Sequence, residues 1–159
     1  DVPSMIQYME AATIRPERNN DMDNQKAISL KINDLEKKYH FVFPESLRKF
    51  YFENDCSALR PFSFIIDNYE CGFAKMIPLI SDGLSFEKIV DDDRTDGFIP
   101  SSYYPIARDR GGNLYYWDAT TEKVYYVLND DIENPFLVFQ DLDDFLNCIQ
   151  AHQLKQTQV

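Results

Sequence analysis

The sequence predicts an α+β fold, an antiparallel or mixed β-sheet flanked by an N-terminal helical hairpin and a C-terminal helix. Three short runs of β-branched and aromatic residues between positions 103 and 128 are separated by polar segments, the pattern of an antiparallel meander. Before them, segments 23–39 and 45–53 carry apolar residues at helical spacing, and segment 141–154 repeats this pattern at the carboxyl end. We therefore expect helices on either side of a central sheet.

The helical hairpin is predicted from one apolar stripe and one proline. The stripe recurs at i, i+4, i+7 and i+11, at Ile28, Ile32, Leu35 and Tyr39. Pro44 disfavours the helical conformation at the residue before it but suits the start of a new helix, so a second helix is expected over Glu45–Glu53. A short helix over residues 3–13 and a polar loop from Arg15 to Gln25 are expected before the hairpin.

The middle of the chain predicts two strands and a short helix. Apolar runs at 62–66 and 73–80 lie on either side of a polar turn at 67–70, which indicates a pair of strands. Segment 83–91 is expected to be helical because its apolar residues do not alternate. An acidic loop, Asp91 to Gly97, is then expected to lead into the meander.

The meander is predicted to contain strands at Tyr103–Ala107, Asn113–Asp118 and Val124–Leu128. Between the first two strands, the corner Gly111-Gly112-Asn113 accepts positive φ at little cost, as a tight turn requires. Residues 135–139 are expected to add one more strand before the closing helix.

The charge of the chain restricts its partners. The 159 residues include 27 acidic and 16 basic side chains, for a net charge of −11. This field repels phosphate backbones and anionic lipid, so we expect neither nucleic acid nor a membrane as a partner. It would attract a basic protein, although acidity alone usually reflects solubility.

Cysteine usage and length predict a single cytoplasmic domain spanning residues 1–159. Cys56, Cys71 and Cys148 are too few and too scattered for a disulfide framework. No signal peptide and no run of 18 apolar residues is found. The chain begins at Asp1 rather than Met, which leaves trimming of the chain and a removed leader both open. The sequence does not indicate an oligomeric state.

No metal site or cofactor is predicted. His40 and His152 lie far apart, and neither has a cysteine or second histidine at ligand spacing. The acidic run before Gly97 does not fit an EF-hand, because the third ligand position falls on Arg94 and the glutamate position on Tyr103.

No catalytic residue is predicted either. The chain lacks a Gly-x-Ser-x-Gly elbow, neither histidine has an obvious cysteine or serine partner, and the cysteines are interpreted as small buried hydrophobes. The turn Arg110–Asn113 lacks the Gly-Lys-Ser/Thr of a phosphate loop. Abundant carboxylates leave open a hydrolase that uses an acid pair, which would require a cleft and opposed pKa shifts.

Several blocks of the sequence together resemble the Smi1/Knr4 family, also called the SUKH superfamily. The first block is Ile32-x-x-Leu35-Glu36 followed by Phe43-Pro44-x-x-Leu47-x-x-Phe50. The second is residues 104–118, a Pro-Ile-Ala strand, a Gly-Gly-Asn turn and an apolar strand ending in Asp118. Later matches are Val124-Tyr125 and the closing Phe139, Leu142, Phe145 and Leu146. The resemblance extends from about Ile28 to Ile149; residues 58–100 depart most, and Asn54-Asp55 stands where the family usually has Asn-Gly.

The resemblance implies a non-enzymatic binding domain of α+β fold. Bacterial members of this family are similar to immunity proteins that bind and neutralise toxins, often nucleases, whereas fungal members regulate cell-wall synthesis. A nuclease is basic around its active site, so an acidic inhibitor could cover that surface. We predict a charged rim for such a basic toxin, with exposed tyrosines as anchors. The rim residues are Asp91, Asp92, Asp93 and Asp96, or Asp130, Asp131 and Glu133. A cell-wall regulatory module and a hydrolase remain the alternatives.

Overall fold

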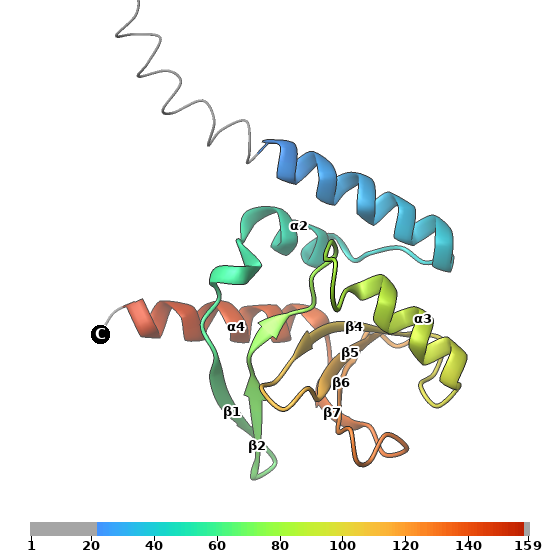
Figure 1. Ribbon diagram of the computed structural model, residues 1–159. Coiled ribbons are helices and arrows are strands. Elements are labelled where there is room, and N and C mark those ends of the chain that lie inside the picture. Colours follow the sequence, from blue (N-terminus) through green and yellow to red (C-terminus); the bar gives the residue numbers. More distant parts are fainter. Residues whose placement is uncertain (1–21, 158–159) are drawn as a thin grey trace, which may run out of the picture.

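The computed structural model describes residues 22–157 of the protein, so the helix expected over residues 3–13 lies outside the described part. Figure 1 shows helices arranged around a central sheet, with the β1–β2 hairpin beside it. Every strand pairing in the described range is antiparallel. The predicted α+β class is confirmed. The prediction left open an antiparallel or a mixed sheet, and the sheet is antiparallel.

The N-terminal helical hairpin has the predicted boundaries. Residues 22–39 are helical, and α2 spans Glu45–Glu53 directly after Pro44. Glu36 holds the connection in place, because its Oε2 accepts a hydrogen bond from the Phe43 N–H (2.7 Å) and pairs with Arg48 (3.2 Å). Leu35 and Phe50 are among the apolar side chains that the two helices bury in the core.

The predicted pair of strands in the middle of the chain was only half right. Strand β1 is Phe62–Ile66 as expected, but β2 is Tyr69–Phe73 and only β3, Lys75–Met76, follows it. The turn is tighter than expected: Asp67 and Asn68 alone form it, with φ of 49° and 65°. Asp and Asn tolerate this left-handed conformation, which two-residue hairpin turns require, and the strand therefore resumes at Tyr69.

The five-stranded sheet has the order β3-β4-β5-β6-β7 and contains the predicted meander. Its later strands are β4 Tyr103–Arg108, β5 Leu114–Asp118, β6 Val124–Val127 and β7 Phe136–Phe139. The β4–β5 turn is closed by a hydrogen bond from the Gly112 N–H to the Asp109 carbonyl (3.3 Å), and Gly112 has φ of 85°. A glycine at this position is the reason that the turn forms without strain.

Helix α3 corrects two expectations. It spans Phe86–Asp96, so the segment expected as an acidic loop from Asp91 is its C-terminal half. The helix begins after Ser85, whose Oγ accepts a hydrogen bond from the Lys88 N–H (3.2 Å), and it ends at Gly97 with φ of 78°. The buried apolar residues of α3 all lie in its first half, so its second half carries no apolar periodicity that indicates a helix. Gly97, in the left-handed conformation, is the residue that marks the helix end.

The two faces of the sheet differ in what covers them. Tyr104 lies opposite Trp117 and Pro105 opposite Tyr116 in the β4–β5 pairing, so Tyr104 and Tyr116 point to opposite faces. The face of Tyr104 also carries Tyr115, which packs against Phe145 of α4 with ring centroids 5.2 Å apart. Tyr116 is next to Tyr115 along β5, so it points to the face that lies away from α4.

The closing helix α4, Leu142–Thr157, was predicted to within a few residues. Asp141 caps it, because its Oδ1 accepts a hydrogen bond from the Asp144 N–H (2.8 Å). Phe145 and Ile149 are fully buried against the sheet. Among the described residues, no helix combines the length and apolarity needed to cross a bilayer.

Candidate functional site

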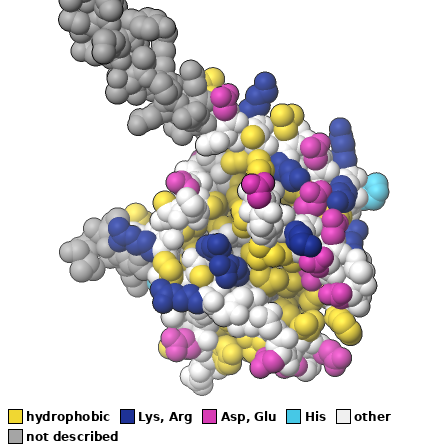
Figure 2. All heavy atoms as spheres, viewed as in Figure 1, with side chains coloured by type: hydrophobic (Ala, Val, Ile, Leu, Met, Phe, Trp, Pro, Cys, Tyr) yellow, Lys and Arg dark blue, Asp and Glu magenta, His cyan; other side chains and the backbone are white. Residues whose placement is uncertain are grey.

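Three tyrosines lie together on the sheet face that points away from α4, and we refer to Tyr103, Tyr116 and Tyr125 as the tyrosine row. The Tyr103 ring stacks with that of Tyr125 (centroids 5.1 Å apart) and contacts that of Tyr116 (6.0 Å). Tyr116 is buried, whereas Tyr103 and Tyr125 are partly exposed. In Figure 2, hydrophobic side chains, a class that includes Tyr, gather over this part of the sheet with acidic side chains beside them.

The α3 acid that joins the tyrosine row is Asp93. Strand β3 pairs only with Arg108 and Ala107, so the first half of β4 has no strand on that side, and α3 packs there. From this position Asp93 accepts a hydrogen bond from the Tyr116 hydroxyl (2.8 Å). Burial raises the pKa of Asp93 to about 6, and the nearby charges of Asp96 and Asp92 act in the same direction.

Asp91, two residues before Asp93, is occupied by contacts within the chain. It accepts hydrogen bonds from the Tyr39 hydroxyl (2.6 Å) and from Lys38 Nζ (3.1 Å), both on the helix of residues 22–39, which we call the leading helix. The Tyr39 hydrogen bond, together with the Lys38 contact, lowers the pKa of Asp91. This acid therefore fastens α3 to the leading helix, and it is less available to a partner than the sequence suggested.

Asp92 and Asp96 remain the accessible acids of α3. Both are exposed, and Asp92 forms only a long, solvent-exposed pair with Lys88 at 3.6 Å. Asp96 forms no ion pair with any of the side chains described between residues 22 and 154. The four acids predicted as one rim therefore differ in their contacts and burial. Asp91 is exposed but bound by Tyr39 and Lys38, Asp93 is half-buried, and Asp92 and Asp96 are exposed without a short ion pair.

The second predicted acidic group lies at the opposite end of the strands. Asp130, Asp131 and Glu133 are exposed in the loop between β6 and β7. The Asn129 N–H donates to Asn113 Oδ1 (2.8 Å), which fixes this loop beside the β4–β5 turn. The end of α3, in contrast, lies near the start of β4. The structure therefore does not join the two acidic groups into one patch.

Asp109 is a buried acid that sequence reasoning missed. Its carboxylate accepts hydrogen bonds from the Asn113 N–H and from Asn113 Nδ2, both at 2.8 Å, and from the Tyr126 hydroxyl. The sequence does carry a signal for this contact: Asp109 and Asn113 stand on either side of Gly111-Gly112, and Asp and Asn side chains commonly hydrogen-bond to the backbone of a turn. Asp109 holds the β4–β5 turn in shape.

The cysteines lack the features of nucleophiles. Burial raises the pKa of Cys56 to about 12 and that of Cys71 to about 11, and it also raises the pKa of Cys148. The structure does bring Cys148 Sγ within 3.8 Å of His152 Nδ1, a pairing that sequence reasoning did not identify although the residues stand at helical spacing. His152 Nδ1 also lies 2.9 Å from the Cys148 carbonyl, and its ring stacks on Phe62.

The remaining chemical alternatives find little support in the geometry. A cavity of about 860 Å³ is lined by the carboxylates Glu53 and Asp55, but both side chains are exposed to solvent. An acid pair in a hydrolase needs one carboxyl group shielded from water so that it stays protonated, and neither of these side chains is shielded. In the described part of the chain, no group of three or more His, Cys, Asp or Glu side chains is arranged to hold a metal ion.

An antiparallel sheet backed by helices, with an aromatic and acidic surface on its other face, is typical of a domain that binds other proteins. The family model of the SMI1/KNR4 family (SUKH-1) matches residues 29–148, and the chain belongs to that family. This range agrees with the resemblance found between Ile28 and Ile149. Comparison with curated proteins finds no match. Family membership supports a protein-interaction or immunity-type domain.

Proposed function

We propose that the protein is a bacterial immunity protein that neutralises a basic toxin of the nuclease class by tight non-catalytic binding. Family membership supports the broader class of interaction or immunity domain. The net charge of −11 supports a basic partner, because opposite charge accelerates encounter and disfavours wrong partners.

The observation that carries the proposal is the tyrosine row beside α3. Tyr103 and Tyr125 expose part of their stacked rings, and Tyr residues with an apolar body and a polar tip are common anchors in interfaces. Asp96 and Asp92 stand exposed at the adjacent helix end. An aromatic centre with a charged rim is the arrangement of a protein-binding surface.

The chemistry of a nuclease fits this surface. A nuclease binds phosphates with Lys and Arg side chains, and these would meet Asp92 and Asp96 while their aliphatic stems pack on the tyrosine rings. Asp93 would ionise more readily when such a cation approaches, because an opposite charge lowers a carboxyl pKa. Binding would then block the phosphate site of the toxin without any reaction.

The first experiment identifies the partner. The tagged protein is used to capture proteins from its native host, and the products of adjacent open reading frames are expressed with and without it. The proposal expects a small basic toxin whose activity the protein abolishes at equimolar ratio. Capture of cell-wall synthesis components in place of a toxin would support the alternative of a regulatory module. Release of sugar from glycan substrates by the protein alone would support the hydrolase.

The second experiment locates the surface once that partner is in hand. Tyr125→Ala is expected to weaken binding by about thirtyfold, as the loss of an anchor does. The pair Asp92→Asn and Asp96→Asn should slow association and reduce its dependence on salt. A variant that neutralises the other predicted rim, Asp130, Asp131 and Glu133, tests whether binding uses that end of the sheet. The matched control is Asp34→Asn, which neutralises an exposed acid of the leading helix. Loss of affinity only in the variant of the 130–133 group would move the interface to that end of the sheet.

A further inference from the structure

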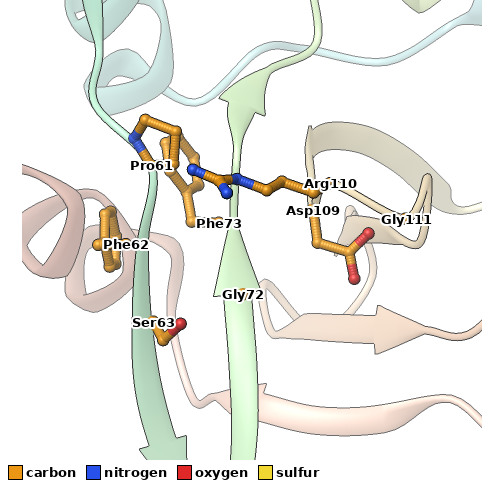
Figure 3. A pocket seen from close by; sticks show the side chains of 8 residues that line it. All are labelled: Pro61, Phe62, Ser63, Gly72, Phe73, Asp109, Arg110 and Gly111. Atoms are coloured by element: carbon orange, nitrogen blue, oxygen red, sulfur yellow. The ribbon is translucent and has the colours of Figure 1, made fainter.

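A second cavity lies where the β1–β2 hairpin meets the β4–β5 turn. Its volume is about 360 Å³, within the usual range for small-ligand sites. Figure 3 shows that its lining comes from both strands of the hairpin and from the turn residues Asp109, Arg110 and Gly111. The cavity shares no residue with the tyrosine row, so a ligand could bind here whether or not the protein has a toxin as its partner.

The hollow exists because two small residues are paired. Ser63 and Gly72 lie directly opposite each other in the β1–β2 pairing. The neighbouring pair, Phe62 and Phe73, is large, but residues next to each other along a strand point to opposite faces. A Cβ added at Gly72 would lie 3.6 Å from Asp109 Cβ, an ordinary contact, so a larger residue would fit here only by filling the cavity.

Arg110 supplies the charge of this cavity. It is the second residue of the β4–β5 turn, and its side chain extends over the hollow toward Pro61 (Figure 3). Arg110 is exposed and forms no salt bridge with the side chains that the structure describes, those of residues 22–154. Its planar guanidinium presents several N–H donors in a fixed geometry that suits a carboxylate.

The adjacent acid does not neutralise Arg110. The Asp109 carboxylate is used by Asn113 and Tyr126, which together donate three hydrogen bonds to it. In Figure 3 this carboxylate points away from the Arg110 guanidinium. The cavity therefore combines an uncommitted guanidinium with the exposed hydroxyl of Ser63 and an apolar wall at Pro61.

We propose that this cavity binds a monocarboxylate that carries an apolar substituent. The carboxylate would lie against Arg110 and accept a hydrogen bond from Ser63, and the substituent would pack on Pro61. A dianion such as phosphate fits less well, because a single arginine balances only one of its two charges and the chain has a net charge of −11. A free organic acid and the C-terminal carboxylate of a peptide share this chemistry.

The test uses phenylacetate as the probe and the full chain as the protein. Proton–nitrogen correlation spectra are recorded during titration with phenylacetate, with neutral phenylacetamide and with inorganic phosphate. We expect saturable shifts at the amides of Gly72 and Gly111 with phenylacetate and much weaker effects with the other two. A peptide ending in phenylalanine, as the free acid and as the amide, shows whether a chain terminus is also accepted.

Variants separate the site from general charge effects. Arg110→Gln should weaken phenylacetate binding by about tenfold or more. Gly72→Val, which fills the cavity but keeps Arg110, should do the same. Lys37→Gln removes an equal charge from an exposed position of the leading helix and should leave affinity unchanged. Equal binding of phenylacetamide, stronger binding of phosphate, or unchanged affinity in Arg110→Gln would each overturn the proposal.

Discussion

Replacing Asp93 by asparagine is predicted to stabilise the protein at neutral pH but not at low pH. Burial, with the charges of Asp96 and Asp92, raises the pKa of Asp93 from its ordinary 3.8 to about 6. A carboxyl group whose pKa rises on folding binds its proton more tightly in the folded state. Its contribution to stability is therefore complete below pH 3.8 and is lost as the pH rises through about 6. Asparagine has no charge to bury, and its Oδ1 can still accept the Tyr116 hydrogen bond.

The magnitude follows from the size of the pKa shift. A shift of this size corresponds to about 3 kcal/mol for a fully buried group. Asp93 is partly accessible, so solvent screening reduces the expected gain to about 1–2 kcal/mol in the free energy of unfolding at pH 7.5. At pH 3.5 the wild-type residue is protonated, and the variant should match the wild type.

Urea unfolding followed by the fluorescence of Trp117, the one tryptophan, measures this difference at both pH values. Contacts with Lys31 and Lys38 lower the pKa of Glu87, and contacts with Tyr39 and Lys38 lower that of Asp91. The stabilisation from these two acids is therefore lost as the pH falls, opposite to the change at Asp93. They are present in both proteins, so their effect cancels in the difference. Asp34→Asn, an exposed acid of the leading helix, is the control and should change stability by less than about 0.5 kcal/mol. An equal effect of Asp93→Asn at both pH values would refute the reasoning.

Three further predictions concern the turn and the thiols. Gly112→Ala should lower the free energy of unfolding by about 1–2 kcal/mol, because Gly112 has φ of 85°. Gly111→Ala, where a Cβ meets nothing closer than 3.6 Å, should be neutral or slightly stabilising. Equal losses of the two variants in urea unfolding would contradict this prediction. Asp109→Ala should lower the free energy of unfolding by about 2–4 kcal/mol, because it leaves Asn113 and Tyr126 without their hydrogen-bond acceptor. A loss below about 1 kcal/mol would show that these hydrogen bonds add little to stability. Native Cys56 and Cys71 should react with a disulfide reagent at pH 8 far more slowly than in urea, since burial raises their pKa values to about 12 and about 11; fast reaction in the native state would be inconsistent with their burial.

Much of the fold could be predicted because its signals are local. The stripe from Ile28 to Tyr39 and the proline at position 44 place the hairpin of helices without any knowledge of the sheet. The meander also follows from local patterns, since its strands are short, aromatic and separated by polar turns. Errors occurred where one residue outweighed the pattern around it. Asn68 adopts positive φ and so allows a two-residue turn. Gly97 ends α3, whose acidic second half is predicted as a loop because it lacks apolar residues at helical spacing.

The candidate site was predicted only in part because charge runs do not reveal which side chains are already bound. Asp91 and Asp92 are neighbours in sequence, yet one is held by Tyr39 and Lys38 while the other faces solvent. Helical geometry separates them by about 100° around the axis of α3, so they meet different surroundings. The partnership of Asp93 with Tyr116 spans 23 positions and has no local signal.

The sequence by itself determined the family, the α+β class and the acidic character of this protein, because these depend on composition, on periodicity and on motifs of adjacent residues. Only the tertiary structure decided which acids remain exposed, that the two acidic groups lie at opposite ends of the sheet, and that Ser63, Gly72 and Arg110 surround one cavity. These features depend on strand pairing and on the packing of α3 against β4. Such contacts join residues far apart in the chain, and their geometry exists only once the core has formed.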